Sequence, residues 1–94
     1  MDIGDIIRCE ADRNYTVIFT RHGKQHIFSR PLKDVEKLLP EELFFRVHQS
    51  HLINIRDIQT YIRGIGGQLI LKNGKVIPVA RTRKDALMKR LFES

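Results

Sequence analysis

Short apolar segments separated by turn-forming residues dominate the first quarter of this chain and predict β structure. Ile6–Cys9 and Tyr15–Thr20 are rich in β-branched and aromatic residues. Ala11–Asn14, which lies between them, is typical of a turn. His22 and Gly23 then mark a tight turn into 25–28, so these residues predict a three-stranded meander.

The middle of the chain repeats this pattern with short connections. Five further strands are predicted: Phe44–His48, Leu52–Ile55, Ile58–Arg63, Gln68–Lys72 and Lys75–Val79. Gly66-Gly67 and Asn73-Gly74 permit positive φ at two adjacent positions, so each pair predicts a two-residue hairpin turn. The chain is therefore expected to be mostly β.

Two segments change to helical spacing. Leu32, Val35 and Leu38 predict a helix over about residues 31–39, with Ser29 as its cap and Pro40 at its end. We expect this helix to pack against the sheet rather than to act as a recognition helix.

A second helix is predicted over about residues 83–92. Thr82 and Asp85 have capping-box spacing before it. Its apolar stripe consists of Leu87, Met88, Leu91 and Phe92.

The size and composition of the chain suit one compact domain over residues 1–94, with 41% hydrophobic residues. No apolar run reaches the ~18 residues that span a bilayer, and the acidic opening lacks the basic start of a secretory signal. A cytoplasmic location without membrane association is therefore expected. The single cysteine, Cys9, excludes an internal disulfide and is expected to be a buried thiol.

The net charge of +6 is concentrated in the last third of the chain. Residues 61–94 carry eight Lys and Arg against Asp85 and Glu93, whereas the charges of residues 1–60 balance. Such a distribution suits a polyanion, because phosphates are neutralised and counterions released. A well-solvated basic surface is the alternative explanation.

Polar side chains at the ends of predicted strands are the candidate binding residues. Gln49 follows the strand Phe44–His48 and can address an adenine edge, and Arg81 follows Lys75–Val79 and can address guanine. Arg83 and Lys84 in a first helical turn oppose the helix dipole. A phosphate bound beside them would reverse this penalty; an exposed helix end that costs a few tenths of a kcal/mol is the alternative.

Catalytic and metal chemistry have little support in the sequence. His48 and His51 supply only half of a zinc site, and Gly64–Gly67 lacks the Gly-Lys-Ser/Thr ending of a phosphate loop. No nucleophile elbow occurs. We therefore expect no enzyme activity, no metal site and no cofactor.

Several motifs in this order resemble the LytTR domain, the DNA-binding module of LytR/AlgR-type bacterial response regulators. The motifs are Asp5–Ala11 leading to Asn14–Thr16, Leu32–Glu36 with Leu39-Pro40, Phe44–His48 with Ser50, Leu52, Asn54 and Ile58, Leu69–Gly74, and Ile77–Val79 before Arg81. The resemblance covers nearly the whole chain.

The resemblance implies an elongated stack of antiparallel β-sheets that docks loops into successive major grooves of duplex DNA. By position, Asn14, Gln49 and Arg81 would contact bases, and the phosphate contacts would come from His48, Ser50, Lys72, Thr82 and Lys84, with Arg83 beside them. The alternative for Asn14 is that it serves only as a turn residue, because Asn tolerates left-handed backbone geometry. Asn54 is assigned to internal hydrogen bonding, and the expected core residues are Val47, Leu52, Ile53 and Val79.

The sequence departs from the family pattern in three respects. Gln49 stands where many members have Arg or Lys, and Ala80 replaces a serine before the arginine. The receiver domain of most relatives is also missing, so the chain is expected to be either a fragment of a longer response regulator or a stand-alone regulator controlled through a partner. A fragment is favoured because the chain begins almost at the first predicted strand. Whether two copies bind a repeated site stays open.

Two other binding functions remain as alternatives. A protein-interaction module would use the closing helix or a sheet edge. A binder of single-stranded nucleic acid or RNA would need exposed Tyr15 or Tyr61 as stacking platforms.

Overall fold

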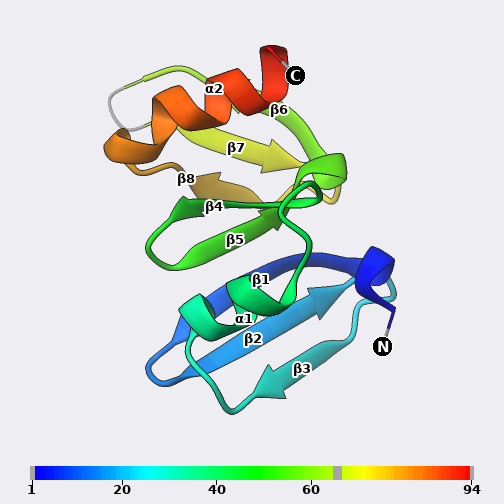
Figure 1. Cartoon of the computed structure of the whole chain (residues 1–94). Coiled ribbons are helices and arrows are strands. Elements are labelled where there is room, and N and C mark those ends of the chain that lie inside the picture. Colours follow the sequence, from blue (N-terminus) through cyan, green and yellow to red (C-terminus); the bar gives the residue numbers. More distant parts are fainter. Residues whose placement is uncertain (1, 65–66, 94) are drawn as a thin grey trace.

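Two antiparallel sheets form the framework of the computed structural model, which describes residues 2–64 and 67–93. The first sheet has the strand order β3-β2-β1-β5-β4 and the second has the order β6-β7-β8. The strands are β1 (Ile6–Asp12), β2 (Tyr15–Thr20), β3 (Gln25–Phe28), β4 (Phe44–His48), β5 (His51–Asn54), β6 (Ile58–Ile62), β7 (Gln68–Leu71) and β8 (Val76–Pro78). Figure 1 shows them stacked in layers, and the longest extent of the molecule is 33 Å. The mostly β stack is confirmed.

Both predicted helices are present, but both predicted caps are wrong. Helix α1 (Leu32–Leu38) begins after Pro31, and α2 (Lys84–Phe92) begins after Arg83; neither N-cap residue makes a side-chain capping hydrogen bond. Ser29 therefore does not cap α1. Arg81–Arg83 form a short 3-10 turn that leads into α2, so Thr82 lies inside this turn and not at a helix cap.

The hairpin turns differ in detail from their predictions. β1 continues to Asp12, which pairs with Tyr15, so the first turn contains only Arg13 and Asn14. Gly74 has a φ of 90°, and its N–H donates to the carbonyl of Leu71. The N–H of Leu71 donates to the carbonyl of Lys75. This is a three-residue loop with one left-handed glycine, and not the predicted two-residue turn. The predicted Gly66-Gly67 turn lies partly outside the described residues.

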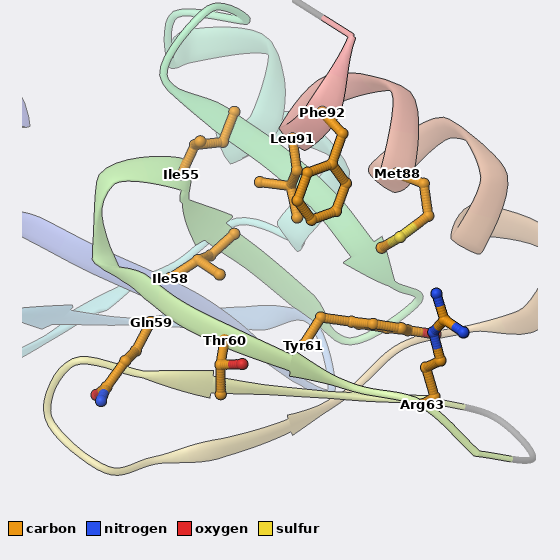
Figure 2. Close-up of a pocket in the computed structure, with 9 residues that line it drawn as sticks. All are labelled: Ile55, Ile58, Gln59, Thr60, Tyr61, Arg63, Met88, Leu91 and Phe92. Atoms are coloured by element: carbon orange, nitrogen blue, oxygen red, sulfur yellow. The ribbon is translucent and has the colours of Figure 1, made fainter.

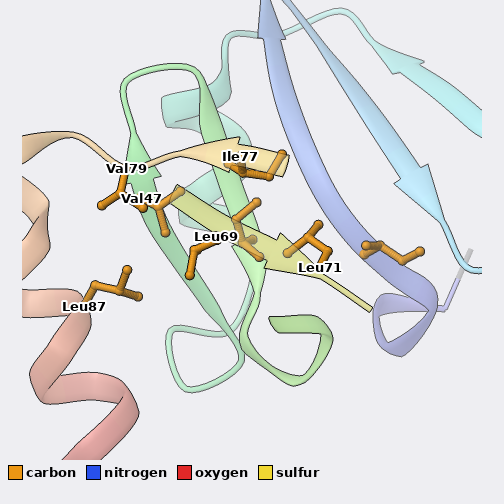
Figure 3. Close-up of a cluster of buried hydrophobic side chains, with 8 residues drawn as sticks. Val47, Leu69, Leu71, Ile77, Val79 and Leu87 are labelled. Carbon is orange, nitrogen blue, oxygen red and sulfur yellow. The ribbon is translucent and has the colours of Figure 1, made fainter. Parts of the chain in front are cut away.

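The core consists of two hydrophobic clusters that meet at β5. Leu52 and Ile53 are adjacent in β5 and point to opposite faces, so each belongs to a different cluster. The first cluster joins β4, β5 and the second sheet to α2, and Figure 3 shows Leu87 pointing from α2 toward it. The second cluster lies between α1 and the first sheet, where Leu32 and Val35 are buried. All four predicted core residues are confirmed as buried.

Buried polar groups hold the end of the molecule that lies far from the β4–β5 turn. Asn54 is fully buried; its Nδ2 donates to the carbonyl of Ile6 over 2.9 Å, and its Oδ1 accepts from Arg56 N–H. Its predicted internal role is confirmed. Asp57 is also buried and binds the guanidinium of Arg21, which links the β2–β3 turn to the start of β6.

Cys9 is the buried thiol that the sequence predicted, with no exposed area. Burial raises the pKa of the Cys9 thiol to about 12, and the nearby charge of Arg8 only partly opposes this. The thiolate is therefore scarce at neutral pH, and the thiol packs as a small apolar group.

Candidate nucleic-acid interface

Three connections from distant parts of the chain meet at one end of the molecule. The Gln49–Ser50 turn lies in the middle. The carbonyl of Ser50 accepts from Ala11 N–H near the first hairpin turn, and the carbonyl of Val47 accepts from Ala80 N–H, each over 2.9 Å. Figure 1 shows the β1–β2 turn, the β4–β5 turn and the β8–α2 connection on the same side, at the left of the view.

The three predicted base-contacting residues lie on these connections and are exposed: Asn14, Gln49 and Arg81. Asn14 is at the tip of the first hairpin, Gln49 is at the tip of the second, and Arg81 follows β8. Because strands on both sides hold each turn, the backbone that presents these side chains is short and anchored. The structure therefore brings the three predicted residues to one face.

Arg46 fixes the position of the Gln49 turn. Its guanidinium donates to the carbonyls of His48 (3.0 Å) and Gln49, and it pairs with Glu36 of α1 over 2.9 Å. Only 13% of the Arg46 side chain is exposed, whereas its partner Glu36 is 43% exposed, so the guanidinium itself is largely buried under the turn that it holds. α1 thus supports the turn through an ion pair, although it lies outside the face itself.

His48 and Ser50 flank Gln49 and are partly exposed. The backbone N–H of Ser50 donates to Nδ1 of His48 over 3.1 Å. An imidazole nitrogen that accepts a hydrogen bond carries no proton, so neutral His48 holds its proton on Nε2. Nε2–H and the Ser50 hydroxyl are the donors that this turn can offer to a phosphate.

His51 lies next to His48 and is electrically neutral at pH 7. The two ring centroids are 5.4 Å apart. Burial lowers the pKa of His51, and the charges of His48, Arg8 and Lys75 add to this effect, whereas Glu10, with Oε1 3.7 Å from Nδ1, opposes it. His51 therefore supports the turn but contributes no positive charge to the face.

The β8–α2 connection carries the densest positive charge on this face. Thr82 and Arg83 lie in the 3-10 turn and Lys84 opens α2, and all three are exposed. A groove of about 460 Å³ lies beside this connection, between the end of β4 and the second sheet. Its polar lining residues include His48, Arg63 and Gln68.

The structure separates Lys72 from the other predicted phosphate contacts. Lys72 lies in the β7–β8 loop, and its N–H donates to the carbonyl of Asp57 over 2.8 Å. This position is at the far end of the second sheet, beside the Arg21–Asp57 pair. Lys72 is exposed there but does not share the face of Gln49 and Arg81.

Three exposed arginines on the face were not among the predicted site residues: Arg13, Arg30 and Arg63. Arg13 is beside Asn14, and the carbonyl of Arg30 accepts from the Thr16 hydroxyl, close to the same turn. Arg63 follows β6 and lines the groove. Charge at turns was visible in the sequence, but the face to which each turn belongs depends on strand order.

Comparison with known proteins identifies the family of this chain. The family model described as the LytTr DNA-binding domain matches residues 1–92. The chain belongs to the LytTR DNA-binding domain family. The resemblance drawn from the sequence motifs is therefore confirmed.

Relatives of this LytTR domain are regulators of greater length. The chain is 34% identical over 94 residues to the sensory transduction protein LytT of Bacillus subtilis, covering 97% of this chain and 38% of LytT. It is 28% identical over 94 residues to the heme-containing CO-sensing transcriptional regulator RcoM 1 of Paraburkholderia xenovorans, covering 97% of this chain and 35% of that protein. The chain thus spans less than two fifths of the length of these relatives.

A solved structure has the same fold as this LytTR domain. It is the LytTr DNA-binding domain of a Bacillus cereus protein described as a methyl-accepting/DNA response regulator. The TM-score is 0.87 at 22% identity, and the match covers 98% of this chain and 85% of that one. The two-sheet stack is therefore a shared fold.

Arg13 gives a test of strain at the tip of the first hairpin. Its φ is 57°, a left-handed conformation that costs a non-glycine residue about 1–2 kcal/mol. We expect Arg13→Gly to raise the free energy of unfolding by about 1 kcal/mol in urea titration and to weaken duplex binding. Arg30→Gly, at a position without positive φ, is the control and should not stabilise the domain. Lower stability of Arg13→Gly would contradict the strain.

Proposed function

We propose that this LytTR domain binds duplex DNA sequence-specifically and acts as the DNA-binding part of a transcription regulator. The observation that carries the proposal is the convergence of three exposed turns on one end of a rigid β stack. In this proposal Arg81 pairs with guanine, and Asn14 and Gln49 pair with adenine edges in the major groove.

The size of the molecule is consistent with contacts in successive major grooves. Its longest extent is 33 Å, and one turn of B-DNA is about 34–36 Å. Turns distributed along the stack can therefore meet the duplex over about one helical turn. His48, Ser50, Thr82, Arg83 and Lys84 would then contact phosphates on both sides of the base-reading residues.

Charge on the face supports the same partner. Six exposed basic residues lie on the connections at this end, against Asp12 and Asp85; the six are Arg13, Arg30, Arg63, Arg81, Arg83 and Lys84. A positive face of this kind favours association with phosphates at low salt. Lys72 is at the opposite end, so we leave it outside the proposed contacts.

The wider assignments extend the same proposal. LytT and RcoM 1 are named as a sensory transduction protein and a CO-sensing transcriptional regulator, so a receiver or sensor unit is the partner we propose for this domain, in the bacterial cytoplasm. Both helices are too short and polar to cross a membrane in the described part of the chain. The proposed role is binding and not catalysis.

Selection from a random duplex pool tests the proposal directly. We expect one enriched site with conserved base pairs in blocks about one helical turn apart, and a guanine in the block that Arg81 contacts. Single strands of the same sequences should compete weakly, because Tyr15 is exposed whereas Tyr61 is partly buried against the first hydrophobic cluster. Equal retention of all duplexes would contradict sequence-specific binding.

A further inference from the structure

A second groove lies between β6 and α2; it shares Arg63 with the first groove but contains none of Asn14, Gln49 and Arg81. Its volume is about 430 Å³. Met88, Leu91 and Phe92 form its wall on α2, and Ile55 and Ile58 lie across from them. Figure 2 shows Phe92, Leu91 and Met88 pointing from α2 toward the strand.

The groove follows the free edge of β6. Four consecutive residues of this strand, Ile58 to Tyr61, line it, although alternate side chains in a strand point to opposite faces. In the described part of the chain β6 pairs only with β7. Alternate N–H and C=O groups of β6 therefore face the groove without a strand partner.

Nothing in the sequence of β6 protects this edge. Natural edge strands carry Lys, Pro or other charged residues that prevent another strand from pairing. Ile58–Ile62 contains none of these. Phe92 is 74% exposed beside the edge, although the sequence placed it in the apolar stripe of the helix.

We propose that the β6–α2 groove binds an extended peptide segment of a partner protein, which adds as an antiparallel strand to β6. Backbone hydrogen bonds to β6 would hold the segment, and its alternate apolar side chains would pack on Met88, Leu91 and Phe92. β6 has five residues, so the added strand covers about 17 Å.

The charge of the groove specifies one end of the peptide. Arg63 is the only charged residue among those described as lining it, and it lies just after β6. A strand antiparallel to β6 begins beside the end of β6. The partner segment is therefore expected to carry an acidic residue at its amino end, before the apolar positions.

A second copy of the chain is a poorer occupant of the groove. Two identical strand edges pair antiparallel around a twofold axis. Ile62 pairs with Gln68, and its neighbour Gly67 lines the first groove together with His48. This end of β6 is therefore the end of the proposed DNA face. Antiparallel pairing of two β6 edges would point the two proposed DNA faces in opposite directions, so the two copies could not bind one duplex side by side. This argument rests on the proposed function.

Titration with a synthetic peptide tests the proposal. The probe is an acetylated peptide of about six residues that begins with glutamate and then alternates valine with threonine. We expect saturable binding to the ¹⁵N-labelled full chain below about 1 mM, with amide shifts in residues 58–62 and 88–92. The same peptide with an initial lysine should bind about fivefold more weakly.

Two matched variants decide whether the groove is the site. Phe92→Ser should weaken peptide binding about tenfold, whereas Ile27→Ser on the edge strand β3, where Ile27 is 75% exposed, should leave it unchanged. Absence of saturation, equal loss in both variants, or shifts confined to β3 would overturn the proposal. So would a sedimentation result in which two copies associate and Phe92→Ser abolishes the association.

Duplex binding by the same proteins separates this proposal from the proposed function. Phe92→Ser should bind the selected duplex as tightly as the unchanged chain, because Phe92 is not on the face of Gln49 and Arg81. If the chain binds the peptide but no duplex, the proposed function fails while the peptide site stands.

Discussion

Replacing Arg81 with alanine is expected to weaken binding to the selected duplex by about 1–3 kcal/mol, which is roughly 5- to 150-fold in affinity. A guanidinium that makes a bidentate contact to guanine distinguishes it from the other bases, and alanine leaves those acceptors without a donor. Arg81 is exposed, so its loss should change the stability of the domain little. Fluorescence anisotropy with the selected duplex and a random duplex measures the difference.

The comparison with random duplex separates base reading from charge. Arg83→Ala removes a charge from the same 3-10 turn and should weaken binding to both duplexes alike, with a salt slope smaller by about one. Arg56→Ala removes an exposed arginine at the far end and should change neither. If Arg81→Ala lost affinity equally on both duplexes, Arg81 would contribute only charge and the guanine assignment would be wrong.

Most of the fold could be predicted because each element carries its own local signal. Short runs rich in apolar, β-branched and aromatic residues predicted all eight strands, and helical spacing predicted both helices to within one or two residues. Glycine marked the loops in which a positive φ is needed, as at Gly23 and Gly74. These signals depend only on residues close together in the sequence, so they can be recognised without knowing the tertiary structure.

The errors occurred where tertiary contacts decide the local geometry. Thr82 and Asp85 have capping-box spacing, but Ala80 is held by the carbonyl of Val47, and Arg81–Arg83 form a 3-10 turn from there. The loop that contains Asn73 and Gly74 has three residues, and the N–H of its first residue, Lys72, donates to the carbonyl of Asp57, just before β6. In each case the loop is bonded to a part of the chain that is distant in the sequence, and the local sequence carries no sign of that contact.

The candidate site was predictable in its residue types and only partly in its positions. Gln49 and Arg81 were singled out because polar groups follow strands there, and they share a face in the structure. Lys72 follows a strand in the same way, but β7 runs away from that face, so Lys72 lies at the other end. Arg46 supports the Gln49 turn but was not among the predicted site residues. It lies within β4, and its contact with Glu36 depends on how α1 packs.

The proposed DNA face depends on the docking of α2, because the β8–α2 connection leads directly into this helix. Leu87 is the one buried residue of α2 and has no exposed area. It joins the cluster of Val47, Leu69 and Val79, which also underlies the end of β4 and the end of β8. Leu87 is therefore the most deeply buried of the α2 side chains that hold the helix, and with it Arg83 and Lys84, against the core; Met88 and Leu91 pack beside it and are only partly buried.

Leu87→Ala is accordingly expected to lower the free energy of unfolding by about 2–5 kcal/mol, since a fully packed leucine is lost and a cavity remains. Each kcal/mol should lower the Tm by about 4–8 °C in a domain of this size. Phe92→Ala removes a larger apolar side chain from the same helix, but Phe92 is 74% exposed, so its effect should stay within about 0.5 kcal/mol. Urea titrations of the two variants make the comparison, and similar losses in both would mean that α2 is held along its whole length and not through Leu87.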